Sequence, residues 1–563
     1  MRTIPSALAA LALFAPGMAA AQSHVEPLVF SREAVASQSA IASRAGADVL
    51  ARGGNAVDAA VATAFALAVA HPAAGNLGGG GFLVVLAPDG RATSFDFRER
   101  APLAARADIF LDGDGVYDSA RHHRGLTSVG VPGSVAGLAL AHHRLGHLAW
   151  RDLVEPAVLL ARDGVVVSRG LAASLREMLP RFATHPPTLA QFSSSGVPLA
   201  AGDVLRQPDL ARTLERIRDE GPAGFYRGET AARIVDEMAR GGGLITLDDL
   251  AQYRAVERVP VRGNYRGLDV ISMGPPSSGG VALVTMLQML ADDDLRTLGS
   301  RSAAEVHLRT EAMRRAFADR ARFLGDADFV DVPLERLVSS AHANELRASV
   351  DPVRASRSTP STFEWPRESD ETTHLSVVDA RRMAVSLTTT LEESYGAAVV
   401  VPGAGFLLNN EMGDFNPRAG LTTDGGLIGT APNLIAPGKR MLSSMTPAIL
   451  ARDGRPVLVV GSPGGRTIIN TVFGIIVEHA DHGLPIQEAV DAPRLHHQWL
   501  PDRLVVERQA LSRDTQARLE AMGHRIETRD GPQGCALAIA VRPDGALEVG
   551  VDRRRADTGA AGR

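Results

Sequence analysis

The chain is poor in cysteine, in lysine and in aromatic residues. Its 563 residues include one cysteine, Cys535, which excludes an intramolecular disulfide and a zinc site built from cysteines. Lys439 is the only lysine, so any chemistry that needs two lysines is excluded as well. The formal net charge of −5 offers no general attraction to phosphates, which argues against nucleic acids and anionic membranes as partners.

Long apolar runs are also scarce. The run from Ala56 to Ala70 is interrupted by Asp58 and is shorter than the roughly 20 residues that cross a bilayer, so we expect a core helix and no membrane span. Hydrophobic residues make up 45% of the chain and charged residues 22%, a balance typical of a globular protein with a large buried core.

The first residues have the pattern of an export signal. Arg2 is followed by an apolar run from Ala7 to Pro16, and Ala19 to Ala21 supplies the small residues of a cleavage site. A buried N-terminal helix is the alternative interpretation. We predict a signal peptide over residues 1–21 and a soluble mature protein in the periplasm or the medium.

The character of the chain changes near residue 350. Before it, apolar spacing near 3.6 predicts helices at 40–51, 134–145, 150–163 and 302–322, with a strand at 81–86. Residues 351–371 are polar and predict an exposed linker. After it, the pattern predicts a hairpin of strands at 374–379 and 383–391, and a strand at 456–460 that leads through a glycine-rich turn into a helix at 466–479.

Several familiar motifs are present only in part. Gly461 to Thr467 resembles a phosphate loop but lacks its lysine, and Asp112 to Asp118 hints at a calcium loop although His123 stands where the closing glutamate belongs. The paired histidines near 480 and 496 lack the HExxH arrangement, and no G-x-S-x-G elbow is found. We therefore expect no metal and no cofactor.

Thr372 stands at the junction between the linker and the first strand of the hairpin. A threonine hydroxyl needs an adjacent base, and an N-terminal threonine carries one in its own α-amine, whose pKa is near 8. Cleavage of the Glu371–Thr372 bond would create such a residue. The alternative is that Thr372 and Thr373 simply begin a strand, which is the usual place of a β-branched pair.

Eight segments, taken in order, resemble the γ-glutamyltransferase (γ-glutamyl transpeptidase, glutathione hydrolase) family. They are 53–60 (GGNAVDAA), 96–99 (DFRE), 275–280 (PPSSGG), 372–379 (TTHLSVVD), 408–410 (LNN), 442–445 (LSSM), 461–465 (GSPGG) and 496–501 (HHQWLP). Each match alone is weak, but together they run from about residue 30 to 550. The resemblance therefore covers nearly the whole mature chain.

The resemblance implies an N-terminal-nucleophile hydrolase of the α+β class, with a four-layer αββα sandwich. Members of the family are inactive precursors that cut themselves into two subunits. Here the large subunit would comprise residues 22–371 and the small subunit residues 372–563, folded together as a heterodimer. Thr372 would attack the Glu371 carbonyl during maturation and a γ-glutamyl amide afterwards.

The resemblance also assigns catalytic roles. Thr372 would form the γ-glutamyl ester, and Thr390, on the second strand of the hairpin, would orient its hydroxyl. Gly464 and Gly465 match the oxyanion hole, which agrees with the physics of a glycine-rich turn that aims N–H groups and a helix dipole at negative charge. A buried strand threonine and an ordinary strand-to-helix turn are the structural alternatives.

The donor's amino-acid end needs a cation for its carboxylate and anions for its ammonium. Arg98 with Ser443 and Ser444 matches the carboxylate site, and a guanidinium makes bidentate contacts that lysine cannot. Asp414 matches the main ammonium partner. An Arg98–Glu99 surface pair, a pair of capping serines and a turn aspartate are the structural alternatives.

Two acidic residues and one glycine depart from the commonest family pattern. Glu392 stands where many relatives have Asn, and Glu411 where many have Gln. Because neighbouring carboxylates raise one another's pKa, we predict that one of Glu392, Glu411 and Asp414 is protonated near neutral pH in the free enzyme. The segment 415–439 resembles the family's lid, with Gly425 about where lid-bearing relatives place a gating Tyr.

These observations predict an exported γ-glutamyl hydrolase and transpeptidase. Its donors would be glutathione and related γ-glutamyl amides, and its acceptors water, amino acids or dipeptides. A same-fold acylase acting on glutaryl-cephalosporin-type amides or poly-γ-glutamate is one alternative, and an unprocessed, non-catalytic binding protein is another.

Overall fold

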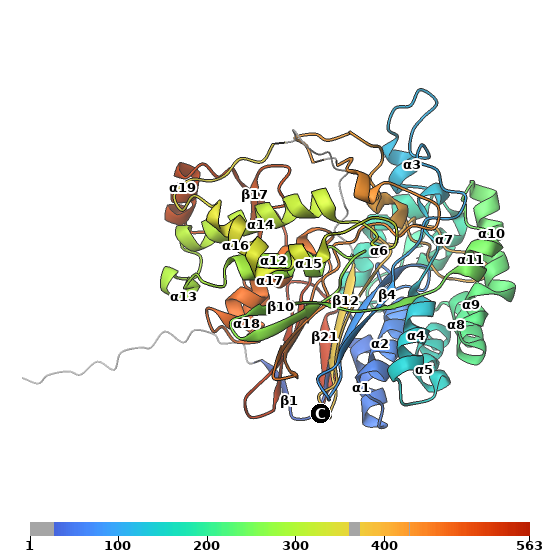
Figure 1. Ribbon diagram of the computed structural model, residues 1–563. Helices are drawn as coiled ribbons and strands as arrows, with labels where there is room; N and C mark the ends of the chain where they lie inside the picture. The colour runs from blue at the N-terminus through green and yellow to red at the C-terminus, as the bar shows by residue number, and fades with distance from the viewer. Residues whose placement is uncertain (1–26, 360–371, 427) are drawn as a thin grey trace, which may run out of the picture.

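Two antiparallel β-sheets lie face to face between two groups of helices in the computed structural model (Figure 1), which describes residues 27–359, 372–426 and 428–563. This is the four-layer αββα arrangement that was expected. The predicted signal peptide (1–21) and Glu371 lie outside the described residues.

Each sheet has seven strands among the described residues. In spatial order, the first sheet is β21 (Gly559–Gly562), β2 (Ala34–Ser37), β12 (Thr373–Val378), β13 (Ala384–Thr390), β3 (Gly80–Leu86), β4 (Ala92–Phe97) and β9 (Val256–Arg258). The second sheet is β1 (Leu28–Phe30), β20 (Leu547–Val551), β19 (Leu537–Val541), β15 (Arg455–Gly461), β14 (Ala448–Arg452), β11 (Leu268–Ser272) and β10 (Val261–Tyr265). A smaller sheet contains β16 (Leu495–His496), β17 (Leu504–Glu507) and β18 (Ile526–Arg529).

The segments before and after Thr372 share both sheets. In the first sheet the hairpin β12–β13 lies in the centre, with Leu375 opposite Ser37 of β2 and Thr388 opposite Phe82 of β3. Strands of an antiparallel sheet are joined by backbone hydrogen bonds along their length. The chain on either side of Thr372 therefore forms one folding unit.

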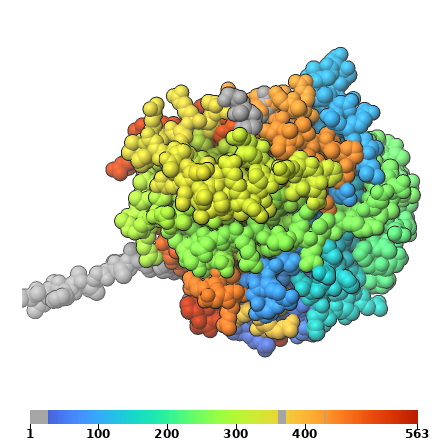
Figure 2. All heavy atoms as spheres, viewed as in Figure 1, coloured from blue at the N-terminus to red at the C-terminus, as the bar shows by residue number. Residues whose placement is uncertain are grey.

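Helices cover the outer face of each sheet. On the first sheet lie α1 (Ala40–Ala51) and α2 (Ala56–Ala70), with α4 (Ser134–Leu145), α5 (Trp150–Asp163), α6 (Arg169–Phe182), α7 (Pro186–Phe192), α8 (Pro208–Glu220), α9 (Ala223–Tyr226), α10 (Gly228–Gly241) and α11 (Leu247–Gln252) on that side. On the second sheet's side lie α12 (Gly279–Met289), α13 (Leu295–Leu298), α14 (Ala303–Phe323), α15 (Leu334–Leu337), α16 (Ser340–Ala348), α17 (Thr467–Ala480), α18 (Ile486–Asp491) and α19 (Arg513–Ala521). In the space-filling view, the yellow-green segment that holds α14 and α16 forms a continuous cover over one side (Figure 2).

Helix α2 shows why the predicted core helix forms. Asn55 and Asp58 make a reciprocal capping box at its start, and Asp58 also accepts a 2.9 Å hydrogen bond from the backbone N–H of His147. All of its residues except Ala70 are buried. The segment 53–60 thus has a structural role, and the predicted helices at 40–51, 134–145 and 150–163 are confirmed with those bounds.

Among the described residues, no helix combines the length and the apolar character that crossing a membrane would require.

Candidate active site

Thr372 lies at the head of a central strand of the first sheet. Its neighbour Thr373 pairs with Thr389 across the β12–β13 hairpin, so continuation of this register sets Thr372 opposite Thr390. Both threonines are buried, with exposed fractions of 4% and 3%. The Thr390 hydroxyl accepts a 2.9 Å hydrogen bond from the backbone N–H of Glu392. The predicted hairpin is therefore confirmed, and it brings the two predicted catalytic threonines together.

One pocket gathers almost all the residues predicted from sequence. It is lined by Arg98, Thr372, Thr390, Glu392, Glu411, Asp414, Ser443, Ser444, Met445, Gly465 and Ile468. Gly464 precedes Gly465 in the same turn. The free space between these side chains is about 20 Å³, which is room for about one water molecule. A ligand with an amino-acid end must therefore displace contacts that the side chains make with one another.

A glycine turn joins β15 to α17 beside Thr372. Gly464 and Gly465 have φ angles of 129° and 52°, which only glycine adopts without strain. Helix α17 begins two residues later, and Thr467 in its first turn donates a 2.6 Å hydrogen bond from its hydroxyl to the Gly464 carbonyl. Gly465 and Ile468 both line the pocket. The partly positive end of the helix dipole therefore lies next to Thr372.

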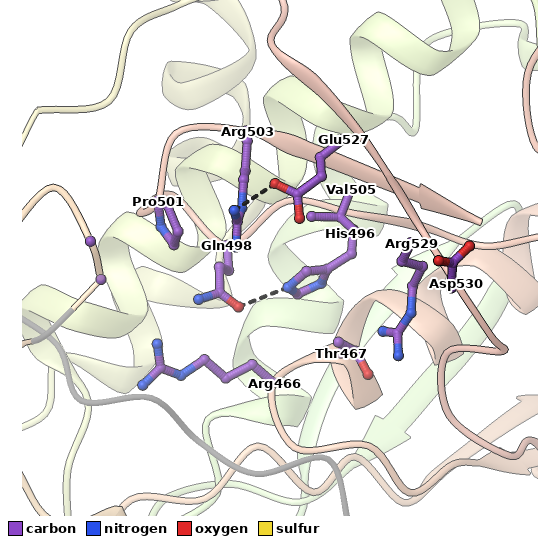
Figure 3. A pocket seen from close by; sticks show the side chains of 12 residues that line it. Arg466, Thr467, His496, Gln498, Pro501, Arg503, Val505, Glu527, Arg529 and Asp530 are labelled. Carbon is purple, nitrogen blue, oxygen red and sulfur yellow. Dashed lines mark hydrogen bonds and ion pairs between the residues drawn. The ribbon is translucent and has the colours of Figure 1, made fainter. Parts of the chain in front are cut away.

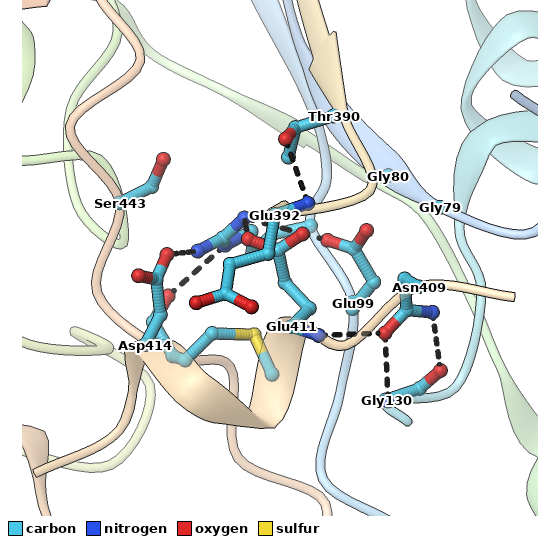
Figure 4. A network of polar contacts seen from close by, with 12 residues as sticks. Gly79, Gly80, Glu99, Gly130, Thr390, Glu392, Asn409, Glu411, Asp414 and Ser443 are labelled. Carbon is cyan, nitrogen blue, oxygen red and sulfur yellow. Dashed lines mark hydrogen bonds and ion pairs between the residues drawn. The ribbon is translucent and has the colours of Figure 1, made fainter. Parts of the chain in front are cut away.

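Arg98 is fully buried and its guanidinium is held by two carboxylates. It follows β4 and forms ion pairs with Glu411 and Asp414 (Figure 4), both on the short helix η2 (Glu411–Asp414). Backbone carbonyls of Met441 and Leu442 accept further bonds of 3.3 Å each. The predicted carboxylate-binding cation is therefore occupied by the protein's own acids, and a substrate carboxylate has to compete with them.

Ser443 and Ser444 are held in place by Ser278, of the 275–280 segment, and by Arg320. Ser278 donates to the Ser443 carbonyl through both its N–H (2.7 Å) and its hydroxyl (2.6 Å). Arg320, on α14, donates to the hydroxyls of Ser278 (2.8 Å) and Ser444 (2.9 Å). Sequence reasoning missed Arg320, which lies inside an ordinary helical pattern and gives no local signal.

Glu392 has a partner that the sequence did not indicate. His123, at the end of α3 (Ser119–His123), has its Nδ1 3.2 Å from Glu392 Oε1. Burial lowers the pKa of His123. In the sequence, this histidine stands at the closing position of the incomplete calcium loop, and nothing local links it to Glu392.

Carboxyl groups near Arg98 are pushed toward their protonated forms. Burial raises the pKa of Glu411 well above its usual value, although Arg98 opposes the shift. Burial likewise raises the pKa of Glu99 to about 7, again against the effect of Arg98. The direction for Glu411 agrees with the prediction of a protonated acid in this cluster. Glu99 was not predicted, and the Arg98–Glu99 pair is buried and not on the surface.

Comparison with known proteins matches this geometry to one family. The sequence model described as Gamma-glutamyltranspeptidase matches residues 42–562. The chain belongs to the gamma-glutamyltranspeptidase family. It is 45% identical to the "Glutathione hydrolase proenzyme" of Escherichia coli (strain K12), over 94% of this chain and 91% of that protein. It is also 37% identical to the "Acylase ACY 1 proenzyme" of Pseudomonas sp. (strain SE83), over 93% and 92%.

Solved structures of the same fold include both kinds of enzyme. A cephalosporin acylase from Bacillus halodurans superposes with a TM-score of 0.85 at 26% identity, covering 98% of this chain and 99% of that chain. The Helicobacter pylori gamma-glutamyltranspeptidase superposes with a TM-score of 0.56 at 42% identity, covering 56% of this chain and 91% of that chain. The N-terminal-nucleophile hydrolase fold is thereby confirmed.

A larger pocket of about 320 Å³ flanks the start of α17 (Figure 3). Arg466 and Thr467, which follow the glycine turn, line one side, and Gln498 and Pro501 of the 496–501 segment line another. His496 Nε2 lies 2.8 Å from Gln498 Oε1. Gly425, in the segment that resembles the family's lid, also borders this pocket.

The single lysine supports the loop behind Asp414. Lys439 is 3% exposed and donates from Nζ to the carbonyls of Pro432 (2.7 Å) and Leu434 (2.9 Å). Between them, Asn433 donates a 2.6 Å bond to the Asp414 carbonyl. Burial lowers the pKa of Lys439 to about 8.

The described residues contain one group of three side chains that could approach a metal ion, formed by His307, Glu311 and His524. The two histidines are bonded to each other, with 2.8 Å between His307 Nδ1 and His524 Nε2. Glu311 is paired with Arg314 and Arg315. The group lies outside the residues that line the Thr372 pocket.

Proposed function

We propose that this family member is an exported, self-processing γ-glutamyl hydrolase and transpeptidase. Its donors are glutathione and other γ-glutamyl amides, and its acceptors are water, amino acids and short peptides. The observation that carries the proposal is the shared pocket, in which Thr372 lies beside Gly465 and the Arg98–Asp414 pair. The names of the relatives support the choice of glutathione.

Maturation requires one peptide bond to be converted into an ester, which is then hydrolysed. The Thr372 hydroxyl attacks the Glu371 carbonyl, so that the C–N bond breaks, the ester forms and the proton of the hydroxyl passes to the nitrogen, which leaves as a free amine. Water then hydrolyses the ester. The products are a carboxylate at Glu371 and a free α-amine on Thr372, the base that turnover needs. Large (22–371) and small (372–563) subunits result, held together by the two shared sheets.

Turnover repeats the same attack on a γ-glutamyl amide. The Thr372 amine takes the hydroxyl proton, the oxygen bonds to the γ-carbonyl carbon, and the developing oxyanion faces the N–H groups at Gly464 and Gly465. The leaving amine departs with the proton. Water or an acceptor amine then attacks the γ-glutamyl ester, restores the Thr372 hydroxyl and releases glutamate or a new γ-glutamyl amide. Thr390 orients the nucleophile.

Recognition of the donor follows from exchange of ion pairs. The donor's α-carboxylate takes the Arg98 guanidinium from Asp414, with Ser443 and Ser444 as further donors of hydrogen bonds. Asp414 and Glu411 thereby become available to the donor's ammonium, with Glu392 nearby. The exchange needs no net loss of ion pairs, because each group that is released finds a partner on the zwitterion.

A side-chain acylase is the second candidate, because an acylase proenzyme and a cephalosporin acylase are among the similar proteins. Retention of Asp414 next to Arg98 favours the γ-glutamyl donor, since a glutaryl group has no ammonium for Asp414 to bind. The ratio of turnover on glutathione to turnover on a glutaryl amide separates the two.

Electrophoresis and mass analysis of three proteins test the proposal. Wild type and Thr373→Ala should each give two unequal bands, with a new N-terminus at Thr372 and activity on a γ-glutamyl anilide. Thr372→Ala should remain one chain without activity. A new N-terminus at any other residue, or full activity of an uncut chain, would refute the assignment of the nucleophile.

A further inference from the structure

Glu99 is buried against Arg98, and its carboxyl group interacts with that of Glu411. Its exposed fraction is 0%, and neither carboxyl oxygen meets a donor at hydrogen-bond distance. The nearest cationic atom is Arg98 Nη1, 3.6 Å from Glu99 Oε2. An ionised carboxylate in such a place is unfavourable unless it is paired and hydrogen-bonded. The geometry thus favours a neutral carboxyl group.

The backbone around Glu99 leaves room for this side chain and little else. A Cβ on Gly80, at the start of β3, would lie 2.6 Å from Glu99 Oε2, and one on Gly130 would lie 3.0 Å from the Glu99 Cβ. Asn409 accepts bonds from the N–H groups of Gly130 (2.8 Å) and Glu411 (3.0 Å), as Figure 4 shows. The carboxyl group is therefore held in place beside the guanidinium.

The charged groups that face Glu99 are few. Arg98 is the cation, and Glu411 and Asp414 on η2 are the acids, both already paired with Arg98. The charge of Glu99 also acts on Tyr226, of α9, and on Tyr253, the residue after α11, and burial raises the pKa of both tyrosines. One guanidinium therefore serves three carboxyl groups.

We propose that Glu99 is a positioning residue that acts in its protonated form. While neutral, it leaves the charge of Arg98 to the donor's α-carboxylate, and once ionised it competes for that charge. This rests on the proposed function, in which Arg98 binds the donor. By linkage, a ligand carboxylate that occupies Arg98 also removes the cation that favours ionised Glu99, so binding and protonation reinforce each other.

The sign of the pH effect follows from the direction of the shift. Burial raises the pKa of Glu99 to about 7, so the neutral form prevails below that pH and is lost above it. Affinity for an α-amino acid should therefore fall as the pH rises through neutrality. If only the neutral form binds, affinity falls about tenfold between pH 6 and pH 8.

The test is calorimetric titration of processed protein with L-glutamate. Wild type should bind about tenfold more weakly at pH 8 than at pH 6, and Glu99→Gln, which mimics the neutral carboxyl, should change less than twofold. Glu257→Gln, an exposed glutamate on β9 paired with Arg144, is the matched control and should keep the wild-type difference. Equal pH dependence in wild type and Glu99→Gln would overturn the proposal.

A second measurement does not depend on the folding of a variant. In two buffers with different ionisation heats, the net number of protons that wild type takes up per L-glutamate should be higher near pH 8 than near pH 6 by close to one, and a proton released by Glu411 would lower both values alike. A net proton uptake that does not rise from pH 6 to pH 8 would also overturn the proposal. Failure of the proposed function is distinguishable, because it would appear as wild-type protein that neither processes nor hydrolyses a γ-glutamyl anilide.

Discussion

Arg320 and Ser444 lie 124 residues apart in sequence, yet the guanidinium donates a 2.9 Å hydrogen bond to the hydroxyl. The same guanidinium binds Ser278, which in turn holds the Ser443 carbonyl. A helix of the outer layer thereby fixes both serines of the donor pocket. The bond also assigns the Ser444 oxygen as an acceptor toward the protein interior.

Loss of Arg320 should therefore weaken donor binding more than chemistry. Hydrogen bonds to charged groups contribute about 1.5–3 kcal/mol, so Arg320→Met should raise KM for a γ-glutamyl anilide by about 10- to 100-fold with a smaller change in kcat. The exposed Arg322 supplies the control Arg322→Met. An unchanged KM in a folded, processed Arg320→Met protein would contradict the role.

Thr390 should matter through its hydroxyl and not through its bulk. Thr390→Val keeps the shape but removes the acceptor of the Glu392 N–H, whereas Thr390→Ser keeps it. We expect kcat to fall at least about tenfold in the valine variant, with slower autoprocessing, and to stay within about threefold in the serine variant. Time courses of band conversion and anilide release measure both effects. Equal losses in the two variants would point to packing instead.

Gly465 should tolerate no side chain. Its φ of 52° costs an L-residue about 1–2 kcal/mol, and relief of that strain would turn the N–H away from Thr372. Gly465→Ala should lower kcat on the order of a hundredfold. Gly483→Ala is the control, since it has φ 71° and its Cβ would meet only the end of the Arg296 side chain. Similar losses of activity in both variants would remove Gly465 from the oxyanion site.

The position of Gly425 offers a gain-of-function experiment. A Cβ there would meet only Thr423 Oγ1, at 3.6 Å, so a larger side chain has room at its base. Gly425→Tyr places a Tyr at the position where the resemblance predicts a gating residue, and it should exclude water better. The ratio of transfer to hydrolysis with a dipeptide acceptor should rise severalfold, and Gly425→Ala should leave it unchanged. A ratio that stays at the wild-type level would show that this segment does not gate water.

Acid should destabilise the protein partly through His374. Burial lowers its pKa to about 3, whereas in the unfolded chain it takes up a proton near pH 6.5. The unfolded state thus binds the extra proton below pH 6.5, and stability falls by about 1.4 kcal/mol per pH unit in that window. Between pH 7 and pH 5, the free energy of unfolding measured with urea should therefore fall by about 2 kcal/mol less in His374→Gln than in wild type. The exposed His143→Gln should behave like wild type.

Local patterns were sufficient for much of the fold. The helices α1, α4 and α5 have the predicted bounds because apolar periodicity and burial coincide along each of them. The β12–β13 hairpin followed from alternation and a short turn, and its register then brought Thr372 and Thr390 together. The sequence motifs that resemble the family's predicted the remaining pocket residues.

Contacts between distant segments could not be predicted in this way. The pairing of Arg98 with η2 joins residues more than 300 positions apart, and nothing near Arg98 indicates it. Glu99 looked like one half of a surface pair because its burial depends on Gly80 and Gly130 in other segments. The contacts of His123 with Glu392 likewise exist only after the chain has folded.

The burial of Lys439 has a practical chemical consequence. With its Nζ enclosed by two carbonyls and 3% of the residue exposed, the sole lysine is shielded from reagents that acylate amines. In a processed protein the remaining amines would be the two chain starts, and one of these, on the buried Thr372, is the catalytic base itself. Loss of activity on acylation would therefore report the modification of a chain start and not of a lysine side chain.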